Sequence, residues 1–236
     1  MAGNDSKKRR LENVIAALKN DKVAIAALVF LVIVIVLSLA APILPLEPNK
    51  TNVAHMLEAP SWEHPFGTDE IGRDYLARVI YGGRISLLVG VLAMMMSVTI
   101  GVTVGTVSGY FGGIVDAVLM RIVDVMQSIP WLVLVTVVSI FFKQGLSSII
   151  IVIGFFTWME IARLVRAEVL SVKEREYVLY AKFTGISSAK MIFRHLIPSV
   201  LPTIIIAATT SISNAIMTES SLSFLGIGIQ EPMSSW

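Results

Sequence analysis

The sequence predicts an all-α, polytopic membrane protein, a bundle of about five transmembrane helices. Of its 236 residues, 55% are hydrophobic and only 15% are charged, whereas a soluble domain carries roughly 25% charge. The charges are also gathered into short segments, which leaves uncharged runs long enough to cross the hydrocarbon core as helices. Strands of a membrane β-barrel alternate in polarity and are about half as long, so they do not explain such runs.

The spans are predicted from these uncharged runs in chain order. The first, Val23–Ala41, is followed by Pro42, Pro45 and Pro48, which end a helix because proline cannot donate a backbone hydrogen bond. The later spans are predicted at Ile85–Val115 with a break at Gly109–Gly113, at Val125–Phe142 extended back to Asp116, at Leu146 to about Ala162, and at about Ser199 to Met217.

Lys and Arg, which concentrate on the cytoplasmic side of membrane proteins, set the expected orientation. With the N-terminus inside, most of the 19 Lys and Arg residues lie in the cytoplasm. The chain then divides into a cytoplasmic N-terminal segment, 1–22, and a membrane domain, 23–236. Within this domain we expect an outer loop at about 47–84, with a short interfacial helix, and a cytoplasmic segment at about 163–198.

The cytoplasmic segment is predicted to contain two helices separated by a glycine. The first runs from Arg163 to Thr184, Gly185 breaks it, and a short helix Ser187–Arg194 follows, which Pro198 ends. A helical element tied to two spans suits an amphipathic lever that seats in a groove of a partner. The alternative is a solvated loop with interfacial helices, which the residue pattern alone favours.

Several blocks of the sequence resemble one family. Part of the cytoplasmic signature of binding-protein-dependent ABC importer permeases is matched by Ala181, Gly185, Ile197 and Pro198. Departures from that signature occur at Leu179, Tyr180 and His195. Further blocks follow in the family's order, at His64–Asp74, Ser108–Gly113, Ser128–Pro130, Arg194–Pro198 and Glu219–Gly228. Together they resemble the second, C-type permease of oligopeptide/dipeptide/nickel importers, from about residue 20 to the end.

This resemblance implies the fold of a type I ABC importer permease, with a sixth span after Trp236, so the chain is expected to be a C-terminally shortened form. It implies a pore-forming subunit that moves dipeptides or oligopeptides into a bacterial or archaeal cell by alternating access. Nickel or another small solute is the alternative. The implied location is the cytoplasmic membrane, which the chain crosses several times with its N-terminus inside.

The resemblance also implies the partners. They are a homologous second permease subunit, two ATP-binding subunits, an extracytoplasmic solute-binding protein and membrane lipid. ATP and Mg²⁺ would be held by the ATP-binding subunits, with no cofactor, metal or catalytic residue on this chain. The net charge of +2 is too small to suggest a nucleic-acid partner.

In that family the element around Gly185 is the coupling helix, which receives the conformational change of the ATP-binding subunit. We expect Gly185 to adopt a backbone conformation that glycine alone reaches at low cost. The residues assigned to coupling are Ala181, Gly185, Ile186, Ser187, Lys190, His195 and Pro198.

A small residue recurs at every fourth position of the second span, at Ser97, Gly101, Gly105 and Gly109. Such a stripe lets two helix backbones approach closely, which is how membrane helices associate. The neighbouring helix belongs either to this chain or to another subunit, and the pattern leaves both open.

Charged residues near membrane depth are candidates for function. Asp116, Arg121 and Asp124 gather at the inner end of the third span, and Glu160 and Arg163 have the same three-residue spacing as Arg121 and Asp124. Both sets are expected to form pairs within one helix, at the membrane interface.

Glu219 follows a long uncharged run and precedes an apolar, glycine-containing segment. It is expected either to line the outer mouth of the pore or to lie at the depth of the lipid headgroups.

Two other functions are weakened by what the sequence lacks. An intramembrane enzyme would need a base beside its nucleophile, but no His or Lys lies at membrane depth near Ser97, Ser128, Ser139 or Ser213. A secondary transporter usually has inverted repeats and buried ionisable groups, and neither is evident. The chain has no cysteine, and the spacing of its histidines, His55, His64 and His195, does not suggest a metal site.

Overall fold

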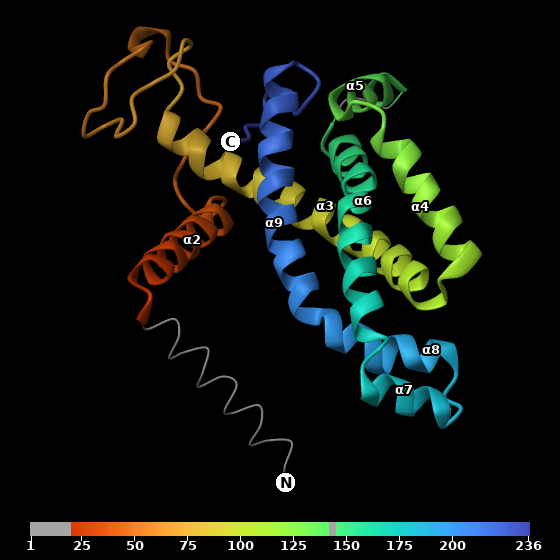
Figure 1. The fold of residues 1–236 in the computed structure, drawn as a ribbon. Helices are drawn as coiled ribbons and strands as arrows, with labels where there is room; N and C mark the ends of the chain where they lie inside the picture. Colours follow the sequence, from red (N-terminus) through yellow and green to blue (C-terminus); the bar gives the residue numbers. More distant parts are fainter. Residues whose placement is uncertain (1–19, 142–144) are drawn as a thin grey trace. The chain divides into compact units, whose positions relative to one another are not determined.

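The computed structural model describes residues 20–141 and 145–236, and the regular elements within these ranges are helices (Figure 1). The chain divides into two compact units, 1–84 and 85–236. The boundary between them falls inside one long helix, α3 (Tyr75–Phe111). Most of the predicted N-terminal segment lies outside the described residues, as do Phe142 and Lys143.

Four helices or helical runs are long and apolar enough to cross a membrane, and one bent pair brings the number to five. The four are α2 (Lys22–Ala40), α3, α6 (Leu146–Val172) and the run Ser188–Phe224. The bent pair is α4 (Gly113–Gln127) with α5 (Trp131–Phe141). The predicted class, a polytopic helical membrane protein, is therefore confirmed.

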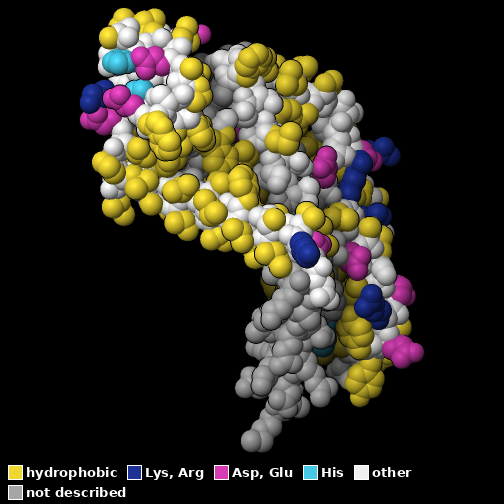
Figure 2. Space-filling view, turned by 90° about the vertical axis from the view of Figure 1, so that its left-hand side faces the viewer, with side chains coloured by type: hydrophobic (Ala, Val, Ile, Leu, Met, Phe, Trp, Pro, Cys, Tyr) yellow, Lys and Arg dark blue, Asp and Glu magenta, His cyan; other side chains and the backbone are white. Residues whose placement is uncertain are grey.

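In the first unit, α2 has a defined N-terminal cap and an apolar surface suited to a membrane. The carboxylate of Asp21 accepts hydrogen bonds from the backbone N–H groups of Val23 and Ala24, both at 3.0 Å, and so caps the helix. Its apolar side chains are exposed over most of the helix surface, and only Ser38 is buried. A helix that is apolar on all sides is stable when lipid or other protein covers it. The face of the molecule shown in Figure 2 is likewise covered mainly by hydrophobic side chains, with its charged groups in a few clusters.

The segment after α2 is ordered by polar side chains around a short 3-10 helix, η1 (Val53–His55). Buried Asp69 accepts hydrogen bonds from the backbone N–H of Ile71 at 3.0 Å and of Arg73 at 2.8 Å, and its other oxygen lies 2.5 Å from Nε of Arg73. Burial alone would raise the pKa of Asp69, but these hydrogen bonds outweigh it and hold the pKa below its usual value.

α3 begins ten residues before the predicted start of the second span, so its first turns belong to the predicted outer loop. The carboxylate of Asp74 accepts a hydrogen bond from the backbone N–H of Ala77 at 2.8 Å. This N-terminal cap lets the helix begin within a charged stretch, because capping and not hydrophobicity sets its first turn.

The second unit is organised around α6 and α9 (Ile197–Phe224), which lie side by side (Figure 1). α4 and α5 pack against α6. At one end of this pair lie α7 (Glu176–Phe183) and α8 (Ser188–Met191). A π-helical turn, η2 (Ile192–Leu196), joins α8 to α9.

The segment predicted as the third span is bent within its described residues. α4 and α5 meet at an angle of 83°, with the break at residues 128–130. The N–H of Ser128 bonds back to the carbonyl of Asp124 at 3.0 Å and closes α4. Pro130 follows and has no N–H to continue the helical ladder, so the chain turns there.

The segment predicted to be cytoplasmic departs from its prediction at two points. The helix expected from Arg163 to Thr184 is broken after Val172, because α6 and α7 fold back to bury Val172 and Val178 in one apolar cluster. Pro198 does not end a helix. It lies in the first turn of α9, where a missing N–H is tolerated.

Candidate functional site

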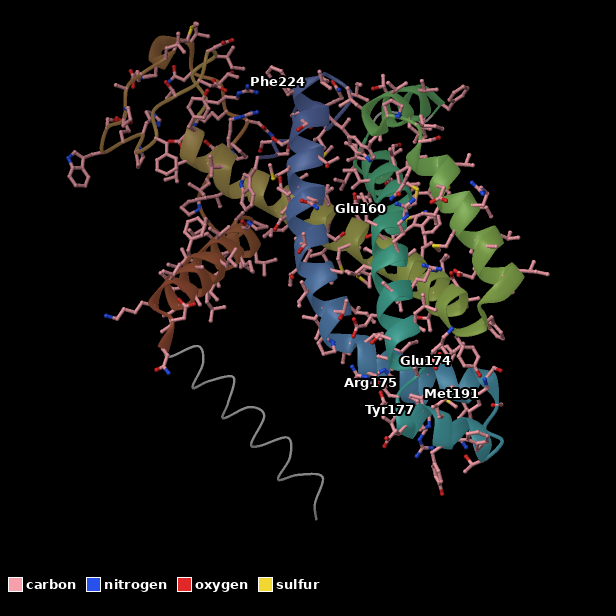
Figure 3. The ribbon with its side chains drawn as sticks, in the orientation of Figure 1. Glu160, Glu174, Arg175, Tyr177, Met191 and Phe224 are labelled. Carbon is pink, nitrogen blue, oxygen red and sulfur yellow. The ribbon has the colours of Figure 1, made fainter. Side chains whose placement is uncertain are left out.

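α7, Gly185 and α8, here called the α7–α8 element, are anchored to both neighbouring spans. Figure 3 labels Tyr177 and Met191 at this end of the bundle. The hydroxyl groups of Tyr177 and Ser199 lie 2.8 Å apart and link α7 to α9. One buried apolar cluster joins the element to α6 and α9, and it includes Val165, Val169, Val172, Val178, Ala181, Met191, Leu196, Val200 and Ile204.

Gly185 has the conformation expected of it. Its φ is +75°, and its N–H donates to the carbonyl of Lys182 at 3.1 Å. The preceding Thr184 closes α7 with an N–H bond to Tyr180 and a hydroxyl bond to Ala181, at 3.1 Å and 2.8 Å. A Cβ at position 185 would meet nothing within 4 Å. The requirement for glycine is therefore one of backbone conformation and not of space.

The other residues assigned to coupling occupy three kinds of place. Ala181 is buried in the apolar cluster, and Ile186 packs against it. Ser187 and Lys190 are exposed at α8. His195 lies in η2, where its carbonyl accepts a hydrogen bond from the Ser199 hydroxyl, and Pro198 is exposed at the start of α9. Their role in coupling stays a prediction.

Sequence reasoning missed the exposed aromatic side chains of this end. Phe183 is 89% exposed, and Tyr180 and Phe193 are each 72% exposed. Tyr180 and Phe183 are three residues apart and share one side of α7. That spacing was visible in the sequence, but an apolar residue near a span is ordinarily assigned to the membrane or the core.

The small-residue stripe of α3 packs inside this chain, which answers the question that the pattern left open. A Cβ at Gly101 would lie 2.7 Å from Cβ of Ile161, and one at Gly105 would lie 2.5 Å from the carbonyl oxygen of Ala162. Ser97, at the other end of the stripe, has its hydroxyl 3.2 Å from that of Ser211 on α9. Gly109 contacts α6 in the same way, with a Cβ 3.0 Å from the Arg166 carbonyl.

The expected pairs within single helices are wrong, because the charges pair between α4 and α6. Arg166 binds Asp116 through Nε and Nη2, at 2.5 Å and 2.6 Å. Arg163 binds Asp124, with Nη2 2.5 Å from Oδ1. A two-pronged contact between guanidinium and carboxylate is stronger than a pair three residues apart on one helix. It can form here because α4 packs against α6.

The expected location of Glu219, at the pore mouth or at headgroup depth, stays a prediction, and the structure shows its immediate surroundings. The side chain is fully buried, one oxygen accepts a hydrogen bond from the Ser223 hydroxyl at 2.6 Å, and the other has no hydrogen-bond partner among the described residues. Ala215 and Leu222 lie on the same face of α9 and are buried in an apolar cluster. Glu219 therefore lies on the buried face of α9, inside the second unit.

Two hollows open along α6 and α9. The larger, about 820 Å³, lies between the α4–α5 bend, α6 and α9, and the smaller, about 190 Å³, lies between α6 and α9. Both are lined by Thr157, Glu160 and Asn214. We call the two hollows together the α6–α9 groove. Sequence reasoning did not single out Thr157 or Asn214, although a polar residue inside an apolar run is a signal for such a lining.

Comparison with known sequences gives two family matches. Residues 101–236 match the profile described as "binding-protein-dependent transport system inner membrane component". Residues 10–60 match the "N-terminal TM domain of oligopeptide transport permease C".

Similar proteins extend this match over most of the chain. The oligopeptide transport system permease protein OppC of Escherichia coli K12 is 42% identical over 220 residues, 92% of this chain and 73% of the relative. The OppC of Bacillus subtilis is 34% identical over 219 residues, 92% and 72% of the two chains. The dipeptide transport system permease protein DppC of Bacillus subtilis is 40% identical over 220 residues, 93% and 69% of the two chains.

Proposed function

Because the chain belongs to the family of binding-protein-dependent transport system inner membrane components, we propose that it is a pore-forming permease subunit of an ATP-driven importer of dipeptides or oligopeptides. Peptides are favoured as the solute because similar proteins named as oligopeptide and dipeptide permeases cover more than nine-tenths of the chain. The chain contributes the transmembrane path and no chemistry, and the energy comes from ATP held with Mg²⁺ on separate subunits.

The observation that carries this proposal is the anchoring of the α7–α8 element. One buried cluster contains side chains of α6, α7, α8 and α9. Because packed interiors transmit displacement with little compression, a movement imposed on α7 or α8 passes to both spans. An element that only covered the end of the bundle would not need buried side chains packed together with those of α6 and α9.

The outer surface of the same element fits a docking partner. Phe183, Tyr180 and Phe193 expose large aromatic surfaces, and aromatic side chains in apolar pockets dominate many protein interfaces. We assign this surface to an ATP-binding subunit, on the cytoplasmic side with the N-terminus. The complete assembly has a homologous second permease, two ATP-binding subunits and a solute-binding protein on the opposite side of the membrane.

The test of the coupling role is Gly185→Val in the reconstituted complex. Because valine at a positive φ strains the backbone by about 1–2 kcal/mol, α8 should lose its orientation while the spans stay assembled. We expect normal membrane insertion, loss of peptide import, and ATP hydrolysis that no longer responds to the loaded binding protein. If stimulation and import both persist at the wild-type level, the α7–α8 element is only a solvated connection.

The orientation is tested with single cysteines, for which the cysteine-free chain is a clean background. Lys50→Cys should react in intact cells with a membrane-impermeant thiol reagent, and Lys182→Cys should react only after the membrane is opened. Labelling of Lys182→Cys from outside would reverse the proposed topology.

A further inference from the structure

The α6–α9 groove contains a carboxylate at membrane depth. α6 is one of the helices apolar enough to span a membrane. Glu160 lies about 21 Å beyond Leu146, the first residue of α6, along the helix axis, at roughly 1.5 Å per residue. A hydrocarbon core of about 30 Å that begins at Leu146 would contain it. Figure 3 labels Glu160 midway along α6, beside α9, and its side chain is exposed. An exposed charge at this depth is costly unless it faces water or a charged partner.

This carboxylate is not paired within the described part of the chain. Arg163, one turn further along α6, is bound to Asp124 with Nη2 2.5 Å from Oδ1. No ion pair or hydrogen bond involves the Glu160 side chain among the described residues. Within the described part of the chain, the groove therefore presents a carboxylate that has no paired cation.

The groups beside Glu160 can act as hydrogen-bond acceptors. The Thr157 hydroxyl donates its proton to the carbonyl of Ile153 at 2.8 Å, so its lone pairs remain free to accept. Asn214, on α9, is exposed and can turn its amide oxygen into the groove. A carboxylate, a hydroxyl oxygen and an amide oxygen together match the three N–H donors of an ammonium group.

We propose that Glu160, with Thr157 and Asn214, binds the N-terminal ammonium group of a peptide during its passage along the α6–α9 groove. The α-ammonium is the cation that all unmodified peptides share, whereas a lysine side chain occurs in only some of them. The larger hollow, about 820 Å³, leaves room beyond the ammonium group for side chains of different sizes. This inference rests on the proposed function as a peptide permease.

The first experiment measures the charge preference of the groove in the assembled complex. A single cysteine, Thr157→Cys, is treated with a cationic aminoethyl methanethiosulfonate and an anionic sulfonatoethyl methanethiosulfonate. With Glu160 present, the cationic reagent should react about threefold to tenfold faster relative to its rate with free thiol. Adding Glu160→Gln should abolish this preference.

Two results of that experiment would overturn the proposal. Equal normalised rates for both reagents would mean that Glu160 does not attract a cation. Failure of both reagents, while Lys50→Cys in the same preparation reacts, would mean that the groove is covered by another subunit and that the partner of Glu160 is a protein side chain.

The second experiment measures import of trialanine by the reconstituted complex with saturating binding protein. Glu160→Gln should lower import about tenfold or more, because it replaces a charge-assisted hydrogen bond by a neutral one, while ATP hydrolysis is still stimulated. Glu160→Asp should restore part of the import. The matched control is Glu168→Gln, the same change on the same helix at a residue that lines neither hollow.

Import at the wild-type rate in Glu160→Gln would contradict the proposal. Loss of import together with loss of ATPase stimulation would also contradict it, since Glu160 would then act in coupling. These failures differ from failure of the proposed function, in which the wild-type complex itself would not import trialanine.

Discussion

Gly105, in the middle of α3, and Gly185, between α7 and α8, differ in what a methyl group would meet at each position. At Gly105 a Cβ would lie 2.5 Å from the carbonyl oxygen of Ala162 and 3.0 Å from the backbone nitrogen of Arg166. At Gly185 it would meet nothing within 4 Å, but φ is +75°. The first glycine is required by the approach of another helix, and the second by the course of its own backbone.

The two glycines therefore have different structural roles. Gly105 permits close packing of α3 against α6, and Gly185 sets the angle between α7 and α8. At Gly101, Gly105 and Gly109, α3 lies so close to α6 that a Cβ would collide with it. In the α7–α8 element, space is available, and only the angle between two helices depends on glycine. Substitutions at Gly105 are therefore expected to disturb assembly, and substitutions at Gly185 are expected to disturb the coupling that we propose for this element.

The largest effect is expected for Gly105→Val. Its side chain would collide with backbone atoms of α6, and overpacking of this kind costs about 1–3 kcal/mol or more. The amount of intact complex that survives heating, measured by size-exclusion chromatography, should fall sharply. Thr103→Val is the control, because Thr103 is exposed on the same helix and should tolerate the change. Equal survival of the two variants would show that α3 and α6 are not held in contact.

The next effect compares the two ion pairs that link α4 and α6. Asp116→Asn leaves the guanidinium of Arg166, 31% exposed, without its two-pronged partner, and should cost about 1–2 kcal/mol. Asp124→Asn removes a pair whose side chains are about half exposed and should cost about 0–1 kcal/mol. Thermal survival of the complex should rank Asp124→Asn above Asp116→Asn, and the reverse order would refute the assignment.

A smaller effect sharpens the contrast between the two glycines directly. Asparagine reaches the left-handed backbone region more easily than other side chains, so Gly185→Asn should keep most of the ATPase stimulation. Gly105→Asn should be as damaging to assembly as Gly105→Val, since the obstacle there is volume. If Gly185→Asn behaves like Gly185→Val, the limit at position 185 is space on a partner and not backbone conformation.

The smallest effect is expected in the first unit, where a hydrogen bond can be weakened without mutation. Nδ1 of His64 lies 2.7 Å from Oδ2 of Asp74, and this hydrogen bond raises the pKa of His64 above its ordinary value. A raised pKa contributes stability that is complete below the unfolded pKa, about 6.5, and is lost as the pH rises through the folded pKa. Amide exchange around Ser61–Asp74, corrected for intrinsic rates, should quicken above that pKa.

His64→Gln provides the control for this last prediction. The variant keeps a polar side chain but cannot titrate, so its exchange rates should not change with pH after correction. Equal pH dependence in the variant and the wild type would assign the change to another group.

The sequence was sufficient for the features that depend on local composition. The first helix begins and ends within one residue of its prediction, α6 begins at Leu146 as predicted, and Gly185 has the expected backbone conformation. These follow from uncharged length and from the geometry of one residue. The small-residue stripe was also recognisable, but its spacing could not say which helix would lie against it.

What the sequence could not predict depends on how helices are placed. Arg163 and Arg166 find their partners on α4 only because α4 lies beside α6. The α4–α5 bend depends on Pro130. A search for uncharged runs does not detect this bend, because proline carries no charge and does not interrupt such a run. Burial of Glu219 depends on its helical neighbours, and the groove at Glu160 forms only when α6, α9 and the bend come together.

The π-helical turn η2 has a consequence for the direction in which α8 points. The N–H of Ile197 bonds to the carbonyl of Ile192, so the turn contains one residue more than an α-helical turn. One residue corresponds to about 100° of rotation around a helix with 3.6 residues per turn. α8 and α9 are therefore out of phase by that amount, and removing one residue from Ile192–Leu196 would turn Lys190 to a different side of the molecule. The side of the molecule on which the side chains of α8 lie is thus set by the number of residues in this π-helical turn.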